Sequence, residues 1–158
     1  MNHATLLPAP EQVLPHRDSA LLLDRILLAD DQQLVALCEV GQWHTPYDGV
    51  DGHLAAWVGP EMMAQAVAAF AGCRRLRQGR PAADIGLLLG VRDYVAHRDE
   101  FVAGDEVRVH VVCSSEDEDG RGVFDCLLSI GEQTAASGTL TVFQPERAGF
   151  IQLLVEPA

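Results

Sequence analysis

The sequence is poor in basic and aromatic side chains and has no long apolar run. Lysine and arginine total 11 residues against 23 aspartates and glutamates, so the net charge is −12. A nucleic-acid partner requires a basic surface, and this balance argues against one. No apolar run approaches the roughly 20 residues that cross a bilayer, so we expect no membrane span. With only 6% aromatic residues, the core must be aliphatic and rich in alanine.

Cysteine is also sparse, and its spacing excludes the common cysteine-based sites. Cys38, Cys73, Cys113 and Cys126 form no CxxC pair, and each falls inside an apolar segment. A zinc site needs clustered ligands, and a disulfide framework is typical of smaller secreted chains. The first residues lack a basic flank followed by a long apolar stretch, which argues against a secretion signal. We therefore expect buried thiols in a reducing cytoplasm and no metal site.

No internal repeat, linker or break in composition divides the chain. Its 158 residues, of which 48% are hydrophobic, suffice for one domain with a sizeable core. We therefore expect a single domain over residues 1–158, with its core at about 14–143.

Alternating apolar residues predict several antiparallel strands. A continuous apolar run, Leu21–Leu28, is interpreted as the first strand, and Asp119-Gly120 is a hairpin signal. Period-two faces recur in four further segments: Leu34, Ala36, Cys38 and Val40; Val107, Val109 and Val111; Phe124, Cys126, Leu128 and Ile130; Gly138, Leu140 and Val142.

Between about Trp57 and Gln78 the residues favour a helix. Gln65 is the only polar side chain between Met62 and Cys73, and many of the others are alanine. A helix that is apolar all round is expected to be buried on every side. Pro60 fits only in its first turn, where the missing N–H costs nothing. One buried helix with several long antiparallel strands predicts an α+β fold with the sheet wrapped around the helix.

Three motifs follow one another along the chain: LPHRDSALLLDRIL at Leu14–Leu27, EMMAQ at Glu61–Gln65 and FVAGDEV at Phe101–Val107. In sequence and in order they resemble the FabZ/FabA family of 3-hydroxyacyl-ACP dehydratases. The stretch WVGPEMMAQ at Trp57–Gln65 is more similar to the ApeP-like branch, the dehydratases of aryl-polyene gene clusters.

This resemblance implies a hotdog fold that acts as a homodimer or as a heterodimer with another hotdog subunit. It also implies a tunnel at the subunit interface with a catalytic histidine and a catalytic carboxylate. The expected reaction converts 3-hydroxyacyl thioesters into trans-2-enoyl thioesters. The substrate would be carried on the phosphopantetheine arm of acyl carrier protein, with no further cofactor.

The catalytic residues are assigned by position. Glu61 is the one acidic residue at the head of the apolar helix and matches the family's carboxylate. The family's His-Phe-Pro element is absent, which leaves His44 and His53 as candidates for the histidine. We favour His44, because a proline follows two residues later and its spacing from Glu61 is closer to the family's. His16 and Arg17 are interpreted as structural.

The chemistry requires a base at C2, an acid for the departing 3-hydroxyl and a polarised thioester carbonyl. Histidine suits the base. A carboxyl group acts as the acid only when it is protonated, which burial favours and a helix start opposes. Backbone amides around Trp57, Val58 and Gly59 are candidates to polarise the carbonyl. Gln65, one turn after Glu61, would bond Glu61 or the substrate, and a buried amide satisfied within the protein is an equal alternative.

One dense basic run stands out in this acidic chain: Arg74, Arg75, Arg77 and Arg80. Such a run complements the dipole at a helix end, and it would also suit the docking of the acidic carrier protein. Two other functions remain open. One is an acyl-thioester hydrolase, whose helix carboxylate activates water. The other is a non-catalytic subunit that supports a catalytic hotdog partner.

Overall fold

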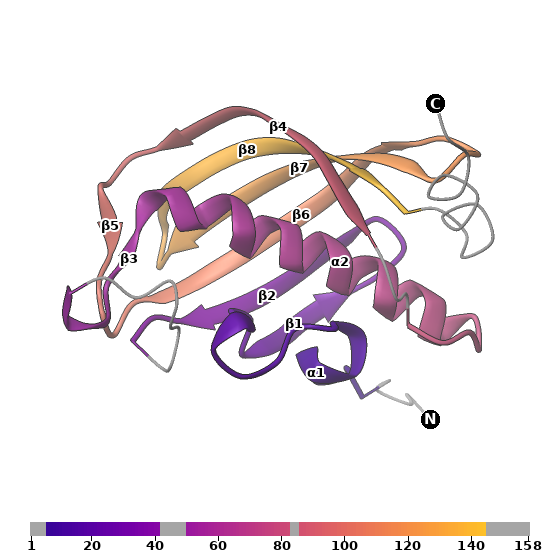
Figure 1. Cartoon of the computed structure of the whole chain (residues 1–158), viewed down its shortest axis with the longest axis horizontal. Coiled ribbons are helices and arrows are strands. Elements are labelled where there is room, and N and C mark those ends of the chain that lie inside the picture. Colours follow the sequence, from indigo (N-terminus) through magenta and orange to yellow (C-terminus); the bar gives the residue numbers. More distant parts are fainter. Residues whose placement is uncertain (1–5, 42–49, 83–85, 145–158) are drawn as a thin grey trace, which may run out of the picture.

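The computed structural model describes residues 6–41, 50–82 and 86–144. Figure 1 shows a curved sheet packed against one long helix. The elements in chain order are α1 (Pro10–Val13), η1 (Asp18–Ala20), β1 (Arg25–Ala29), β2 (Gln33–Glu39), η2 (Val50–Gly52), β3 (Leu54–Ala55), η3 (Ala56–Val58), α2 (Gly59–Arg77), β4 (Leu87–Ala96), β5 (Glu100–Phe101), β6 (Glu106–Glu116), β7 (Arg121–Ile130) and β8 (Gln133–Phe143).

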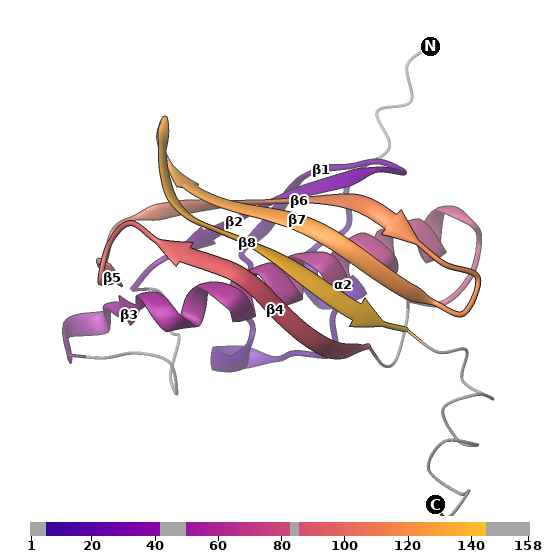
Figure 2. The same ribbon diagram turned by 90° about the horizontal axis from the view of Figure 1, so that it is seen from above.

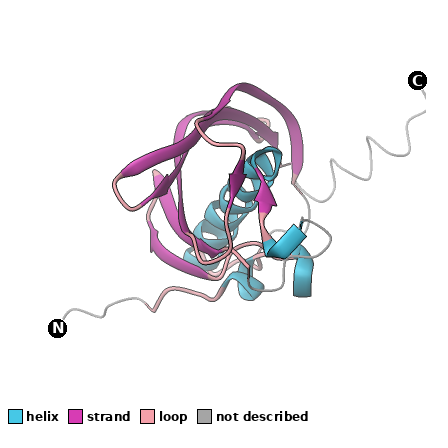
Figure 3. Cartoon of the chain, turned by 90° about the vertical axis from the view of Figure 1, so that its left-hand side faces the viewer, coloured by secondary structure: helices cyan, strands magenta, loops and turns pink. Residues whose placement is uncertain are grey.

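The main sheet has six strands in the order β1-β2-β6-β7-β8-β4, and every neighbouring pair is antiparallel. The strand that follows α2, β4, lies at one edge of the sheet beside β8 (Figures 1 and 2). Seen along the helix, the strands curve around α2 (Figure 3). The predicted α+β arrangement, a sheet wrapped around one long helix, is therefore confirmed.

The predicted strand faces form the core beneath the helix. The apolar side chains of β2 and β6 that alternate in sequence are fully buried, as are most of those on β7 and β8: Leu34, Ala36, Cys38, Val107, Val109, Val111, Phe124, Cys126, Leu128 and Leu140. Period-two alternation identified these strands because one face of each lies on α2 while the other faces solvent. The predicted hairpin is also present, since Gly120 turns the chain between β6 and β7 with a φ of 92°.

The long helix occurs where the sequence predicts it, with Pro60 in its first turn. Its burial differs from the prediction. Ala64, Ala68 and Ala71 are only partly buried and line a groove along the helix. The expectation of a helix buried on every side is wrong, because the sheet covers one side of α2 and this alanine face is left open. None of the described helices is long and apolar enough to cross a membrane.

The N-terminal apolar run is only partly a strand. The strand β1 begins at Arg25, whereas Leu22 and Leu23 are buried in a non-strand segment before it. The backbone N–H of Leu22 donates to the side chain of Gln65 rather than to another strand. The predicted strand over Leu21–Leu28 therefore started too early, since an apolar run shows burial but not the partner of its backbone.

Candidate active site

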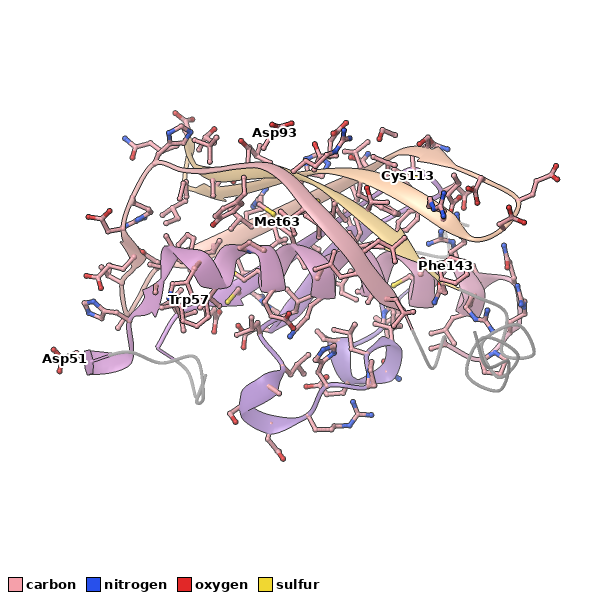
Figure 4. All side chains as sticks on the ribbon, turned by 45° about the horizontal axis from the view of Figure 1, so that its top comes forward. Asp51, Trp57, Met63, Asp93, Cys113 and Phe143 are labelled. Atoms are coloured by element: carbon pink, nitrogen blue, oxygen red, sulfur yellow. The ribbon has the colours of Figure 1, made fainter. Side chains whose placement is uncertain are left out.

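A groove of about 240 Å³ follows the open face of α2. Glu61 lies towards its start, and the alanines Ala64, Ala68 and Ala71 form its floor along the helix. Figure 4 places Trp57 beside the first turn of α2 and Phe143 near the other end of the helix. The helix also contributes Gln65, Val67, Phe70 and Arg74. The remaining lining residues come from the N-terminal segment and from the ends of β4, β6, β7 and β8: Val13, Pro15, His16, Gly86, Leu87, Leu88, Glu116, Gly120, Gly122, Phe124, Val142, Phe143 and Gln144.

Glu61 is the third residue of α2, where the helix dipole favours a negative charge. Its side chain is 36% exposed, and its Oε1 accepts a hydrogen bond of 3.0 Å from Nε2 of Gln65. The same oxygen lies 3.7 Å from Nε2 of His16. Among the described residues, no hydrogen bond or ion pair involves Oε2 of Glu61, so this oxygen is available to a ligand in the groove.

Gln65 connects Glu61 to the N-terminal segment. Its side chain is 1% exposed, and all of its recorded contacts are made inside the protein. Nε2 donates to the carbonyl of Ala20 at 2.8 Å as well as to Glu61, and Oε1 accepts from the N–H of Leu22 at 2.9 Å. Both hydrogens of the Gln65 amide are therefore used within the protein. The predicted hydrogen bond between Gln65 and Glu61 is one of these two bonds. Direct contact between Gln65 and a substrate stays a prediction.

His16 is the histidine that the described residues bring to Glu61, although sequence reasoning treated it as structural. It follows α1 in a segment that also lines the groove. Nη1 of Arg17 donates to the carbonyls of Leu14 and His16 at 2.6 and 2.7 Å and so fixes this turn. The Leu-Pro-His-Arg motif at Leu14–Arg17 was the sequence feature that pointed to His16. Because the motif lies far from Glu61 along the chain, the sequence did not indicate that His16 and Glu61 are close in space.

The two histidines chosen from the sequence are placed differently. Nδ1 of His53 lies 3.2 Å from Oε1 of Glu100, next to the short β3–β5 sheet. The structure therefore records Glu100, and not Glu61, as the partner of His53. His44 lies outside the described residues, so its position relative to Glu61 stays a prediction.

The segment before α2 leads tightly into the helix. The N–H of Ala56 donates to the carbonyl of Asp99, and the N–H of Gly59 donates to the carbonyl of Ala56. The N–H of Val58 is the first donor of the i→i+3 bonds of η3, with the carbonyl of Ala55 as its acceptor, which leaves the amide of Trp57 as the candidate to contact a thioester carbonyl. Trp57 is 70% exposed and Val58 is buried.

Tyr94 of β4 explains the glycine at the start of α2. Its hydroxyl donates to the carbonyl of Ala56 at 2.5 Å and lies so close to Gly59 that a Cβ there would collide with it. Burial raises the pKa of Tyr94. Only glycine permits this approach of β4 to the helix start.

The far end of the groove is closed by an ion pair. Arg74 donates two hydrogen bonds of 2.6 and 2.7 Å to the carboxylate of Glu116, and its guanidinium stacks on Phe70. The hydrogen bonds from Arg74 to Glu116 raise the pKa of Arg74. Glu116 is thus neutralised, whereas no arginine of the described chain pairs with Glu61.

The remaining arginines of the basic run lie at the end of α2. Arg77 donates to the carbonyl of Asp30 and forms an ion pair with Asp31. Arg75 donates to the carbonyl of Pro81, and Arg80 follows the helix in an exposed position. The run therefore holds the helix end and still presents cationic groups at the surface.

The described cysteines are neither activated nor grouped into a metal site. All four cysteines are free thiols, and burial raises the pKa of Cys38, Cys73 and Cys126, the last to about 12. These groups are protonated at neutral pH, so they are poor nucleophiles. In the described part of the chain, no three His, Cys, Asp or Glu side chains are grouped closely enough to hold a metal ion.

A curved antiparallel sheet around a central helix is the hotdog fold, and solved structures share it with this chain. TT0310 protein from Thermus thermophilus is 17% identical, with a TM-score of 0.57 over 76% of this chain and 90% of that one. Cj0977, a sigma28-regulated virulence protein from Campylobacter jejuni, is 11% identical, with a TM-score of 0.61 over 87% and 88%. At these identities the likeness establishes the fold.

The model of the ApeP-like family, described as ApeP dehydratase, matches residues 8–153. The chain belongs to this family of dehydratases. It is also similar to a chain of the dehydratase heterocomplex ApeI:P from Xenorhabdus doucetiae, at 26% identity and a TM-score of 0.86 over 94% of this chain and 99% of that one. None of the curated proteins compared with this chain matches it.

Proposed function

We propose that this chain dehydrates 3-hydroxyacyl thioesters to trans-2-enoyl thioesters with the acyl chain lying in the groove along α2. One observation carries the proposal: a partly exposed carboxyl group that no arginine of the described residues neutralises, Glu61, stands at one end of an alanine-lined groove. An apolar acyl chain fits the alanine floor, and the reacting C2–C3 bond would lie at Glu61.

The elimination needs a base and an acid, and the atoms balance without a cofactor. The base histidine takes the C2 proton, and that electron pair forms the C2–C3 double bond as the C3–O bond breaks. The departing hydroxyl takes a proton from Glu61 and leaves as water. The imidazolium then returns a proton to the carboxylate. An acyl chain that covers Glu61 excludes water from the reacting groups.

The base and the carbonyl-binding groups are assigned from the sequence. His44 remains our candidate for the base and His53 the alternative, which must leave Glu100 to act. The amide of Trp57, just before the helix, would bind the thioester oxygen as charge develops on it.

Acyl carrier protein is the proposed source of the substrate, with docking at the arginine run. In an acidic chain, the exposed cations at the end of α2 offer an attractive surface to an acidic partner. Arg75 has only a backbone carbonyl as its recorded partner, so replacing it removes charge without breaking an internal ion pair. For Arg75→Ala we expect KM for the carrier-bound substrate to rise several-fold at unchanged kcat. An unchanged KM would remove Arg75 from the docking surface.

A second hotdog subunit is proposed to pair along β4. This strand is ten residues long, and among the described strands it bonds only to β8, so no described strand pairs with its other edge. Its apolar side chains Leu87, Leu88, Leu89, Val91 and Val95 are 36–50% exposed. Because Leu87 and Leu88 also line the groove, a subunit placed there would complete the wall of the active site.

The Leu89→Lys/Val91→Lys variant tests this surface by size-exclusion chromatography with light scattering. We expect the variant to lose a self-dimer, or to lose a co-purifying hotdog subunit. The two outcomes distinguish a homodimer from a heterodimer. An assembly that is unchanged in the variant would show that β4 is not the interface.

The reaction itself is tested with a 3-hydroxyacyl thioester while enoyl absorbance and free thiol are recorded together. We expect enoyl product without thiol release, and its loss in Glu61→Gln but not in Glu11→Gln, an exposed carboxylate on α1. Thiol release that depends on Glu61 would instead identify a thioesterase. Activity that appears only with a second subunit and is indifferent to Glu61→Gln would identify a supporting, non-catalytic subunit.

A further inference from the structure

We propose that His16 is a positioning residue that holds the carboxyl group of Glu61 through its Nε2–H and does not itself take the C2 proton. This inference rests on the proposed function, because it gives His16 a role relative to Glu61 as the reacting carboxyl group. It is carried by the geometry of His16 and by the state of its second ring nitrogen.

The first observation is the convergence of two donors on one oxygen. Nε2 of Gln65 donates to Oε1 of Glu61 at 3.0 Å, and Nε2 of His16 lies 3.7 Å from the same atom. One contact comes from the helix itself and the other from the N-terminal segment. The distance to His16 exceeds that of a hydrogen bond, and contacts in unoccupied active sites commonly shorten when substrate binds. Both side chains are about one-third exposed, so a small movement is sterically open to them.

The second observation concerns Nδ1 of His16, which is buried and has no hydrogen-bond partner among the residues that the structure describes. A neutral imidazole has one N–H and one bare nitrogen. A buried N–H without an acceptor is rare and costly. The proton is therefore placed on Nε2, where it faces Glu61, and Nδ1 is the bare nitrogen.

With its proton on Nε2, His16 can donate a hydrogen bond to Glu61 but cannot accept the C2 proton at that nitrogen. To take the C2 proton through Nε2, the ring would need a bare Nε2 and a proton on the buried Nδ1. An imidazolium would also leave an unpaired N–H at Nδ1. The surroundings of the ring thus favour a donor to Glu61 and disfavour an acceptor of protons from the substrate.

The neighbouring contacts explain why His16 can hold this position. Arg17 bonds the carbonyls of Leu14 and His16, and Leu14 is buried against the core. Gln65 bonds the backbone at Ala20 and Leu22 a few residues further on. The turn that carries His16 is therefore fixed at both ends, and one end is fixed by the same glutamine that bonds Glu61.

Paired substitutions test the role of the Nε2–H. The amide nitrogen of glutamine can occupy the place of Nε2, whereas that of asparagine can occupy the place of Nδ1. We expect His16→Asn to lower kcat roughly 10- to 30-fold at nearly unchanged KM, and His16→Gln to stay within roughly 3-fold of the wild type. His110→Gln is the control, because His110 bonds Gln33 on the outer face of the sheet. Urea unfolding of each variant shows whether a loss of activity is a loss of fold.

Nitrogen-15 NMR of histidine-labelled protein at pH 8 gives a readout that does not depend on activity. Ring-nitrogen shifts distinguish the two neutral tautomers, and His16→Gln identifies the His16 signals by their absence. We expect the Nε2–H form. An Nδ1–H form would overturn the proposal even if the chain alone showed no turnover.

The outcomes separate this inference from the proposed function. If wild-type protein, alone or with a co-purifying subunit, produces no enoyl thioester, the proposed function fails. The NMR measurement then still shows whether the proton of His16 is on Nε2, as the inference requires. If Glu61→Gln is inactive while His16→Asn equals the wild type, only the role of His16 is wrong. If His16→Gln is as inactive as His16→Asn, His16 acts as more than a donor, and the positioning role is refuted.

Discussion

Replacing Gln65 by leucine removes the hydrogen bonds that join the N-terminal segment to the helix while keeping a side chain of similar size. The N–H of Leu22 is left buried without its acceptor, at a cost of about 1–3 kcal/mol. The carbonyl of Ala20 and Oε1 of Glu61 also lose a donor, but both residues are only partly buried, so we assign about 1 kcal/mol to them together. The apolar leucine offsets about 1 kcal/mol. The net loss in the free energy of unfolding is therefore about 1–3 kcal/mol.

Urea denaturation followed by circular dichroism measures this loss at fixed protein concentration. A matched control is Gln78→Leu, the same chemical change at an exposed position just after α2, where we expect a change within about 0.5 kcal/mol. We also expect Gln65→Leu to lower the dehydration rate, because Glu61 loses the donor that holds it. A Gln65→Leu protein as stable as the control would refute the view that this glutamine fixes the N-terminal segment on the helix.

Three further results follow from the structure. Ala68→Trp fills part of the groove, so in steady-state kinetics it should raise KM for long acyl substrates roughly 10-fold and change KM for short ones by no more than roughly 2-fold. An equal effect on both substrates would show that the acyl chain does not lie in this groove. Gly59→Ala should lower the urea midpoint, and adding Tyr94→Phe should recover part of the loss because the colliding hydroxyl is gone; no recovery would contradict that collision. The unfolding free energy should fall as pH rises above about 8.5, because the folded state raises the pKa of Cys38 and Cys126 and so keeps protons that the unfolded thiols release. A urea midpoint as high at pH 10 as at pH 8 would contradict this.

The strands that the sequence predicted well are those with one buried face. On β6, Val107 and Val109 alternate with polar residues because only one side of the strand meets α2. The edge strand β4 lacks this signal. Its leucines and valines are exposed in the isolated chain on one edge of the sheet, so no simple alternation marks it. An apolar strand of this kind fits the partner surface that we propose for β4.

The site was predictable where its residues are close in sequence. Glu61 and Gln65 lie one helical turn apart, so their contact follows from helix geometry. The approach of His16 to Glu61 depends on how the N-terminal segment folds back on α2, and no local pattern encodes it. The pairing of His53 with Glu100 similarly depends on the β3–β5 contact.

The most direct test of the account is the intact mass of a 3-hydroxyacyl carrier protein incubated with this chain, alone and with any subunit that co-purifies with it. We predict that the carrier loses the mass of one water and keeps its thioester, and that Glu61→Gln abolishes this loss while Glu11→Gln does not. Loss of the whole acyl group, or an equal loss of water with Glu61→Gln, would contradict the account.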